Sequence, residues 1–188
     1  MNYFISDLHF RHENILSFDN RPFQTVQEME AKIINNWNKK VNNKDTVYIL
    51  GDFSLSRDEK VWIEILDKLN GKKVLIRGNH DIVKMSKKLS EKFIEITDYK
   101  MIKENGNKII MSHYPILFYN HSSSKNTYML YGHVHERYES QLIQYFVEQI
   151  KDLKSYSKDR YNQGQLYNVG CMLDYMDYTP RSLEEIIY

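Results

Sequence analysis

The fold is read most directly from residues 3–9, whose sequence is YFISDLH. The apolar first part, Tyr3 to Ile5, has the residue types and the length of a buried β-strand. The polar second part places Asp7 and His9 directly after that strand. Residues two apart on a strand share a face but lie roughly 7 Å from each other, so both side chains can turn toward one ion only if the chain bends there.

The same pattern, a short apolar run that ends in polar residues, recurs four times further along the chain. The runs are three to five residues long and cover 46–50, 73–76, 109–111 and 128–131. They end, in that order, in Gly51-Asp52, Gly78-Asn79-His80-Asp81, Ser112-His113 and Gly132-His133-Val134-His135. Ligands bind at the carboxyl ends of strands in layered α/β proteins, so these residues are the candidates for a functional site.

The apolar residues between the early runs follow helical spacing. Residues 26–41 predict one helix, for which Thr25 and Glu28 offer a capping box. Residues 61–69 predict a second helix, with Ser56 and Glu59 as its capping box. Strands that alternate with helices favour α/β layers and parallel pairing.

The second half of the chain has a different pattern. Segments 99–103 and 108–111 flank Glu104-Asn105-Gly106-Asn107, which predicts a hairpin and therefore a mixed sheet. Residues 138–163 are polar but keep a helical rhythm, and they separate the strand near His135 from an expected strand at 166–169. We therefore expect a single domain over 1–188 with a helical insertion at about 138–163.

Composition excludes several classes of protein. Of the 188 residues, 41% are hydrophobic and 27% are charged, which excludes a largely disordered chain. The 26 Lys and Arg against 25 Asp and Glu give a net charge of +1, so we expect no dedicated nucleic-acid surface. Cys171 is the one cysteine, which excludes a disulfide framework and a thiolate zinc site. No apolar run could span a membrane and no signal peptide is recognisable, so we expect a cytoplasmic protein.

The side chains at the strand ends form a set of oxygen and nitrogen metal ligands. Each motif alone has an ordinary structural interpretation, such as Asp7 capping a turn or His113 lying in the core. Five such elements in this order are unlikely to arise by chance. A site with one shared carboxylate and three further ligands for each ion would use Asp7, His9, Asp52, Asn79, His113, His133 and His135. Two ions about 3.5–4 Å apart could then bind a phosphate and activate a bridging water.

These five motifs resemble the signature blocks of the calcineurin-like metallophosphoesterase superfamily. Similarity to small stand-alone bacterial and phage phosphoesterases extends to residues 7–15, 21–23 and 168–170. The resemblance implies a four-layer αββα sandwich with mixed sheets. It also implies two divalent metal ions, with Mn favoured and Fe, Ni, Zn or Mg as alternatives.

The resemblance assigns roles residue by residue. Asp7, His9 and His135 would bind the first metal, Asp52 would bridge the two, and Asn79, His113 and His133 would bind the second. His80 would contact the scissile phosphate as general acid, with Asp81 orienting it. Arg11, His12 and Arg21 are candidate substrate contacts. The alternatives are a surface loop position for His12 and a surface salt bridge for Arg21.

The function expected from these residues is phosphoester hydrolysis. Few cationic side chains lie in the motifs, which favours a singly charged phosphodiester in a small nucleotide-like substrate over a dianionic monoester. A phosphomonoesterase and a catalytically weak metal-binding interaction module remain as alternatives. Because every ligand type and His80 are present, an enzyme is favoured. Exposed tyrosines and the 138–163 stretch could support a homodimer, which is therefore a further expectation.

Overall fold

Eight strands form two four-stranded sheets in the described part of the computed structural model, which comprises residues 1–135, 137–151 and 164–188. All neighbours in the first sheet are parallel, and its strands are, in spatial order, β1 (Asn2–Ile5), β2 (Thr46–Ile49), β3 (Lys72–Ile76) and β4 (Glu95–Thr97). The second sheet has the order β5 (Tyr99–Glu104), β6 (Asn107–Ser112), β7 (Thr127–Tyr131) and β8 (Leu166–Asn168). Its β5–β6 pair is antiparallel and the other two pairs are parallel, so the predicted mixed sheet is confirmed.

Two longer helices cover the outer face of the first sheet. Helix α2 (Val26–Lys40) begins at Thr25, whose side chain accepts a hydrogen bond from the backbone N–H of Glu28. Helix α3 (Glu59–Lys68) begins at Asp58, which accepts from the N–H of Lys60. The capping box predicted at Ser56 is therefore wrong: the helix starts later, and its N-cap is the aspartate beside Glu59.

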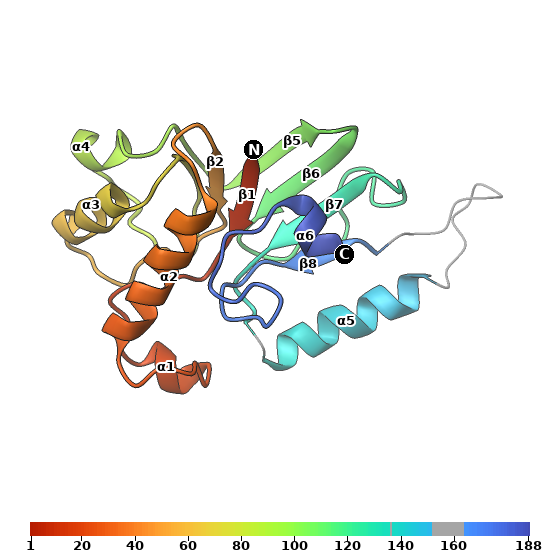
Figure 1. The fold of residues 1–188 in the computed structure, drawn as a ribbon. Coiled ribbons are helices and arrows are strands. Elements are labelled where there is room, and N and C mark those ends of the chain that lie inside the picture. The colour runs from red at the N-terminus through yellow and green to blue at the C-terminus, as the bar shows by residue number, and fades with distance from the viewer. Residues whose placement is uncertain (136, 152–163) are drawn as a thin grey trace.

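Four further helices complete the described elements. Helix α5 (Tyr138–Lys151) connects the parallel strands β7 and β8 and lies on the outer side of the second sheet (Figure 1). The other three are short: α1 (Ile15–Phe18), α4 (Lys87–Ser90) and α6 (Leu183–Ile187), the last with a complete capping box between Ser182 and Glu185. The predicted helical stretch 138–163 is described only as far as residue 151, and 152–163 lie outside the described residues.

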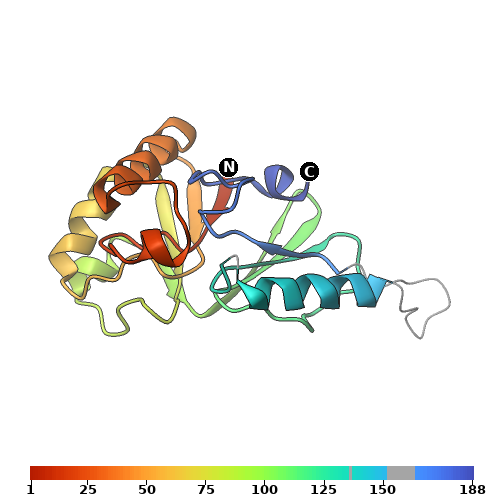
Figure 2. The same cartoon turned by 90° about the horizontal axis from the view of Figure 1, so that it is seen from below.

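The layers follow the order helix, sheet, sheet, helix, as Figure 2 shows from below. One core cluster joins the fully buried Trp37 of α2 and Trp62 of α3 to strands of both sheets. A second cluster joins Ile110 and Met129 of the second sheet to Ile143 of α5. The α/β layering expected from the sequence pattern and the two-sheet sandwich implied by the resemblance are thereby confirmed.

The sandwich gathers the carboxyl ends of five strands at one edge. Strands β1, β2 and β3 end there because they are parallel, and so do β6 and β7. The sheets are linked beside this edge, since Ser6 forms a bridge with Gly170 just after β8. None of the helices described is both long and apolar enough to cross a membrane.

Candidate metal centre

The polar residues predicted from the strand ends meet at this one edge of the sandwich. Each follows its strand within four residues. Asp7 and His9 follow β1, Asp52 follows β2, Asn79 and His80 follow β3, His113 follows β6, and His133 and His135 follow β7.

The backbone turns sharply at most of these positions. Five of the predicted ligands have a positive φ: Asp7 (55°), His9 (51°), Asp52 (53°), His133 (71°) and His135 (49°). Left-handed backbone costs free energy in residues other than glycine, and it clusters at functional sites. Here it supplies the bend that lets Asp7 and His9, two residues apart, turn toward one point. It also sends His133 and His135 to different groups, although their spacing predicts one strand face.

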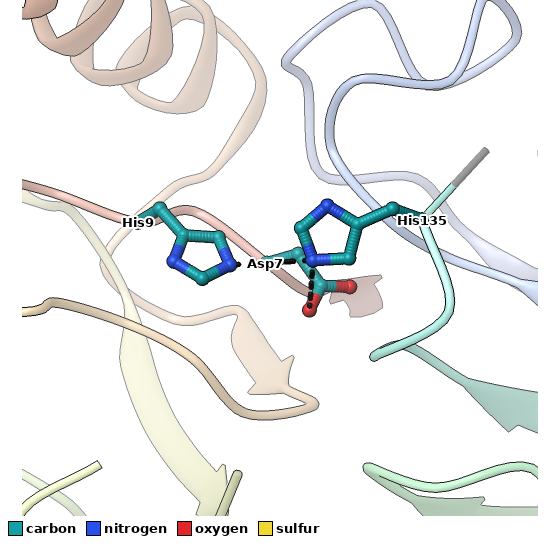
Figure 3. A group of neighbouring side chains, drawn as sticks. All are labelled: Asp7, His9 and His135. Carbon is teal, nitrogen blue, oxygen red and sulfur yellow. Dashed lines mark hydrogen bonds and ion pairs between the residues drawn. The ribbon is translucent and has the colours of Figure 1, made fainter. Parts of the chain in front are cut away.

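The first group of ligand atoms comes from Asp7, His9 and His135. Their ligand atoms all lie within 4.8 Å of one another. The Nε2 atom of His135 is 3.4 Å from Nε2 of His9 and 3.7 Å from Oδ1 of Asp7. Figure 3 shows the two rings and the carboxylate around a common centre. All three residues are buried, so the group is a rigid set of donors largely removed from solvent.

The second group comes from Asp52, His113 and His133, within the same 4.8 Å limit. Oδ2 of Asp52 is 3.6 Å from Nε2 of His113 and 3.7 Å from Nε2 of His9. One carboxylate oxygen therefore lies between the two groups. Asn79 joins the second group, because its Oδ1 is 3.0 Å from Nε2 of His113.

Hydrogen bonds behind the histidines hold their rings in place. Nδ1 of His113 donates to the carbonyl of Leu50 (2.8 Å), and Nδ1 of His135 donates to Oδ2 of Asp19 (2.7 Å). A proton on Nδ1 leaves the Nε2 lone pair directed into the centre. Outer hydrogen bonds of this kind fix the tautomer of metal-binding histidines.

His9 has a similar partner on its outer side. Its Nδ1 lies 3.2 Å from Nδ1 of His12. If His9 carries its proton on Nδ1, it donates to His12 and its Nε2 is left as a ligand. His12 is thus placed behind a predicted ligand, and its ring also borders the cavity described below.

The protonation states suit a cation. Burial lowers the pKa of His9 far below the usual value, and it also lowers the pKa of His133. Desolvation acts in the same direction on His135, but the hydrogen bond that it donates to Asp19, together with the negative charges of Asp7 and Asp19, outweighs it and raises the pKa of that ring. Neutral imidazole is the form that binds metals, and the nearby carboxylates supply negative charge. The donor set therefore fits divalent metal ions that take oxygen and nitrogen ligands.

Glycines allow the loops to approach this closely. A Cβ at Gly78 would lie 2.3 Å from Oδ1 of Asp52, and one at Gly132 would lie 2.6 Å from Oδ2 of Asp7. Both distances are far below van der Waals contact. The glycine of each motif is thus required by the packing of a ligand carboxylate.

His80 lies at the rim of the centre. Its backbone N–H donates to Oδ1 of Asp52 (2.9 Å), and its ring centroid is 5.6 Å from that of His9. Asp81 was expected to orient His80. Instead its buried carboxylate accepts from three backbone N–H groups, those of Asp52, Phe53 and Gly78. Asp81 thereby ties the loop after β2 to the loop after β3.

Two of the three expected substrate contacts are engaged elsewhere. Arg21 has a fully buried side chain that donates to Oδ2 of Asp19 and to the carbonyl of Asp7, so it supports the β1 loop and is not accessible to a substrate. Its expected substrate contact is therefore wrong for this structure. Arg11 pairs with Glu30 at 3.1 Å and faces Glu64 at 3.9 Å.

A cavity of about 350 Å³ opens over the ligand groups. Its lining combines the imidazoles with an apolar wall and one arginine. The lining residues are His9, His12, Ile15, Phe18, Asp52, Leu55, Asn79, His80, His133, His135 and Arg137.

Sequence reasoning missed Asp19 and Arg137. Asp19 follows none of the five strand-like apolar runs, and only the fold brings it to His135, 116 positions away. Arg137 stands two residues after a predicted ligand, and this proximity is the signal that could have drawn attention to it.

Comparison with known proteins finds a matching family model and similar chains. The family model described as calcineurin-like phosphoesterase matches residues 3–168. The uncharacterised protein MJ1445 of Methanocaldococcus jannaschii is 42% identical over 134 residues, which are 71% of this chain and 68% of that protein. The Gene 66 protein of Mycobacterium phage L5 is 39% identical over 82 residues, 42% of this chain and 39% of that protein.

A solved structure shares the fold. The crystal structure of AQ665, a protein of unknown function from Aquifex aeolicus, aligns with a TM-score of 0.63 at 31% identity. The alignment covers 100% of this chain and 97% of that one.

Proposed function

The chain belongs to the calcineurin-like phosphoesterase family, and on that premise we propose that it hydrolyses a phosphodiester at a two-metal centre. The observation that carries the proposal is the position of Oδ2 of Asp52, which lies within 3.7 Å of a histidine from each ligand group. A carboxylate shared between two donor groups is what a pair of ions would need. Asp7, His9 and His135 would hold one ion, and Asn79, His113 and His133 the other.

Two divalent ions in these groups would supply positive charge to the phosphoryl oxygens and an acidified water as nucleophile. Mn is the metal that we propose for assays, because the donors are oxygen and nitrogen without thiolate. The hydrogen bonds to Leu50 and Asp19 keep the Nε2 lone pairs directed inward. The chain would thus hold the donors in position before any substrate arrives.

We propose that His80 provides the proton for the leaving oxygen. Its ring lines the cavity beside His9 and His12, while its backbone is fixed by Asp52. A poor alkoxide leaving group needs such a proton, and a group placed for this transfer contributes about 10²–10⁴-fold to the rate.

The small number of cationic side chains in the cavity supports a phosphodiester as the substrate. Among its lining residues in the described part of the chain, Arg137 is the only lysine or arginine. A monoester dianion would call for more cationic groups than a diester monoanion. The wall of Ile15, Phe18 and Leu55 offers an apolar surface for an organic substituent, which a diester carries on both sides of its phosphorus.

The test compares the two ester classes under one metal and one pH. We expect kcat/KM of the Mn-loaded protein to be higher for bis-p-nitrophenyl phosphate than for p-nitrophenyl phosphate. The same order should hold for a cyclic nucleotide against its monophosphate product. A monoester preference in both pairs would contradict the diester proposal, and hydrolysis of neither class would favour a binding module.

A further inference from the structure

We propose that Arg137 binds the phosphoryl group of the substrate and that Asp19 holds Arg137 beside the metal ligands. The inference rests on the proposed phosphoesterase function and adds a specificity-determining residue to it. The resemblance that suggested the metal ligands assigns no role to either residue.

Arg137 reaches the cavity from the segment after β7. Its side chain is 54% exposed, and it shares the cavity wall with His9, Asp52 and His135. The guanidinium is therefore open to a solute that enters the cavity. It is also adjacent to the atoms at which a phosphoryl oxygen would be held.

Asp19 lies directly behind Arg137. Its side chain is 3% exposed, and Oδ2 accepts from Nδ1 of His135 and from the guanidinium of Arg21. Oδ1 is buried and has no hydrogen-bond partner in the described structure. A buried carboxylate oxygen without a partner is costly, so it attracts the nearest cation.

Arg137 supplies a cation close to that oxygen. Its NH2 lies 3.8 Å from Oδ1 of Asp19, which is within ion-pair range but beyond hydrogen-bond range. The carboxylate therefore draws the guanidinium toward His135 without using its N–H donors. No hydrogen bond from that guanidinium to another described residue is found, so its donors can bind the paired oxygens of a phosphate, which the planar fork fits.

The other arginines around the site are already engaged. Arg11 pairs with Glu30, Arg21 is buried against Asp19, and NH1 of Arg57 donates to the carbonyls of His80 and Asp81. Arg137 is the one of these four that lines the cavity.

The test measures the binding of inorganic phosphate to the full-length Mn-loaded protein by isothermal titration calorimetry. Arg137→Gln should raise the Kd for phosphate about 10–100-fold, the effect of losing hydrogen bonds from a charged donor. Arg137→Lys should recover part of the loss, because it keeps the charge but not the fork. Bound Mn, measured by elemental analysis, should stay at the wild-type level.

Lys87→Gln is the matched control, since it removes one positive charge from α4. Its side chain is 89% exposed, and Figure 1 places α4 far from α1 and the start of α5. It should bind phosphate as the wild type does. Steady-state kinetics should show Arg137→Gln raising KM for bis-p-nitrophenyl phosphate more than it lowers kcat.

A double-mutant cycle tests Asp19 as the positioning residue. Asp19→Asn keeps a hydrogen-bond acceptor for His135 but removes the charge that attracts Arg137. It should weaken phosphate binding in the wild-type background and have a much smaller effect in the Arg137→Gln background. Equal effects in both backgrounds would show that Asp19 acts independently of Arg137.

Three results would overturn the proposal. They are an unchanged phosphate Kd in Arg137→Gln with Mn retained, loss of Mn together with phosphate binding, and no phosphate binding by the wild type. Failure of the diester proposal is distinguishable from these, because the titration measures binding and needs no turnover. If the protein binds phosphate through Arg137 but prefers monoesters, only the proposed preference for phosphodiesters is refuted.

Discussion

Left-handed backbone at five ligand positions is the feature of single residues that most strongly marks this site. A positive φ costs conformational free energy at Asp and His that it would not cost at glycine. The penalty is offset only if these side chains must point where they do. The types and spacing of these residues were readable from the sequence, and so was the need for a bend between Asp7 and His9. The left-handed conformation at all five positions was not, because a regular strand pattern carries no signal for it.

The sequence could also not distinguish a buried arginine from an exposed one. Arg21 precedes Pro22 in a polar stretch and looked available for a phosphate. Its burial comes from contacts with Asp19 and with the backbone of Asp7, which lie on other parts of the chain. Asp81 is a similar case, since its three backbone partners include residues of the loop after β2.

The shared position of Asp52 predicts an asymmetry between the two aspartates. Asp52→Asn should weaken both ligand groups, whereas Asp7→Asn should damage mainly the first. We expect kcat/KM to fall at least about 100-fold for Asp52→Asn, since even partners outside the ligand shell are worth 10–100-fold. Elemental analysis after Mn loading should show less bound metal in Asp52→Asn than in Asp7→Asn. Equal losses in the two variants would argue against a bridging carboxylate.

The rim position of His80 predicts a chemical defect without metal loss. His80→Ala should lower kcat about 10²–10⁴-fold for a diester with a poor leaving group. The loss should shrink for a p-nitrophenyl ester, because a good leaving group needs little protonation. Bound Mn should match the wild type. An unchanged kcat with the poor leaving group would rule out the acid function.

Helices and strands were predictable where apolar residues recur at a regular strand or helix spacing. The strands β1, β2, β3, β6 and β7 and the helix α2 lie within a few residues of the apolar runs that predict them. Short elements such as α4 and β4 were not predicted, since three or four residues carry too little periodicity. The start of α3 was misplaced, because Ser56 and Asp58 both offer a capping oxygen and only packing selects between them.

Helix α5 carries two apolar stripes, and the structure shows which of them packs. Ile143 is 8% exposed and faces the second sheet, while its neighbour Leu142 is 59% exposed. Ile143→Ala should lower the free energy of unfolding by about 2–3 kcal/mol, through lost burial and the cavity left behind. Leu142→Ala is the matched control and should change it by less than about 0.5 kcal/mol. Urea titrations followed by circular dichroism would measure both, and equal effects would contradict α5 as a packed layer.

The second sheet and α5 also predict how stability responds to alkali. Burial raises the pKa of Tyr119 to about 12 and that of Tyr131 to about 12, whereas both would ionise near 10 in the unfolded chain. The folded state therefore holds these protons more tightly. The stability that these two tyrosines contribute should be fully present below pH 10 and should fall as the pH rises from 10 toward 12, by up to about 1.4 kcal/mol per pH unit for each tyrosine.

Tyr119→Phe isolates one of the two contributions. It removes the hydroxyl that donates to the carbonyl of Gln165, so it should cost some stability at pH 8. Its unfolding free energy should then decline less steeply between pH 10 and 11.5 than that of the wild type. Urea midpoints at several pH values would measure the two slopes, and identical slopes would show that Tyr119 titrates normally.

At the scale of the whole molecule, the site exists because parallel pairing brings five strand ends to one edge. That convergence was predictable from the order of apolar runs and polar ends. The positions of Asp19 and Arg137 were not, because they depend on where α1 and the start of α5 meet the edge. The expected cytoplasmic location and the homodimer stay predictions.

The central claim is that two metal ions sit in the paired ligand groups with Asp52 between them. Anomalous X-ray diffraction from crystals of the Mn-loaded protein tests it most directly. We predict two anomalous peaks about 3.5–4 Å apart, one beside Asp7, His9 and His135 and the other beside Asn79, His113 and His133. Oδ2 of Asp52 should lie within bonding distance of both. A single peak, or peaks away from these residues under saturating Mn, would contradict the account.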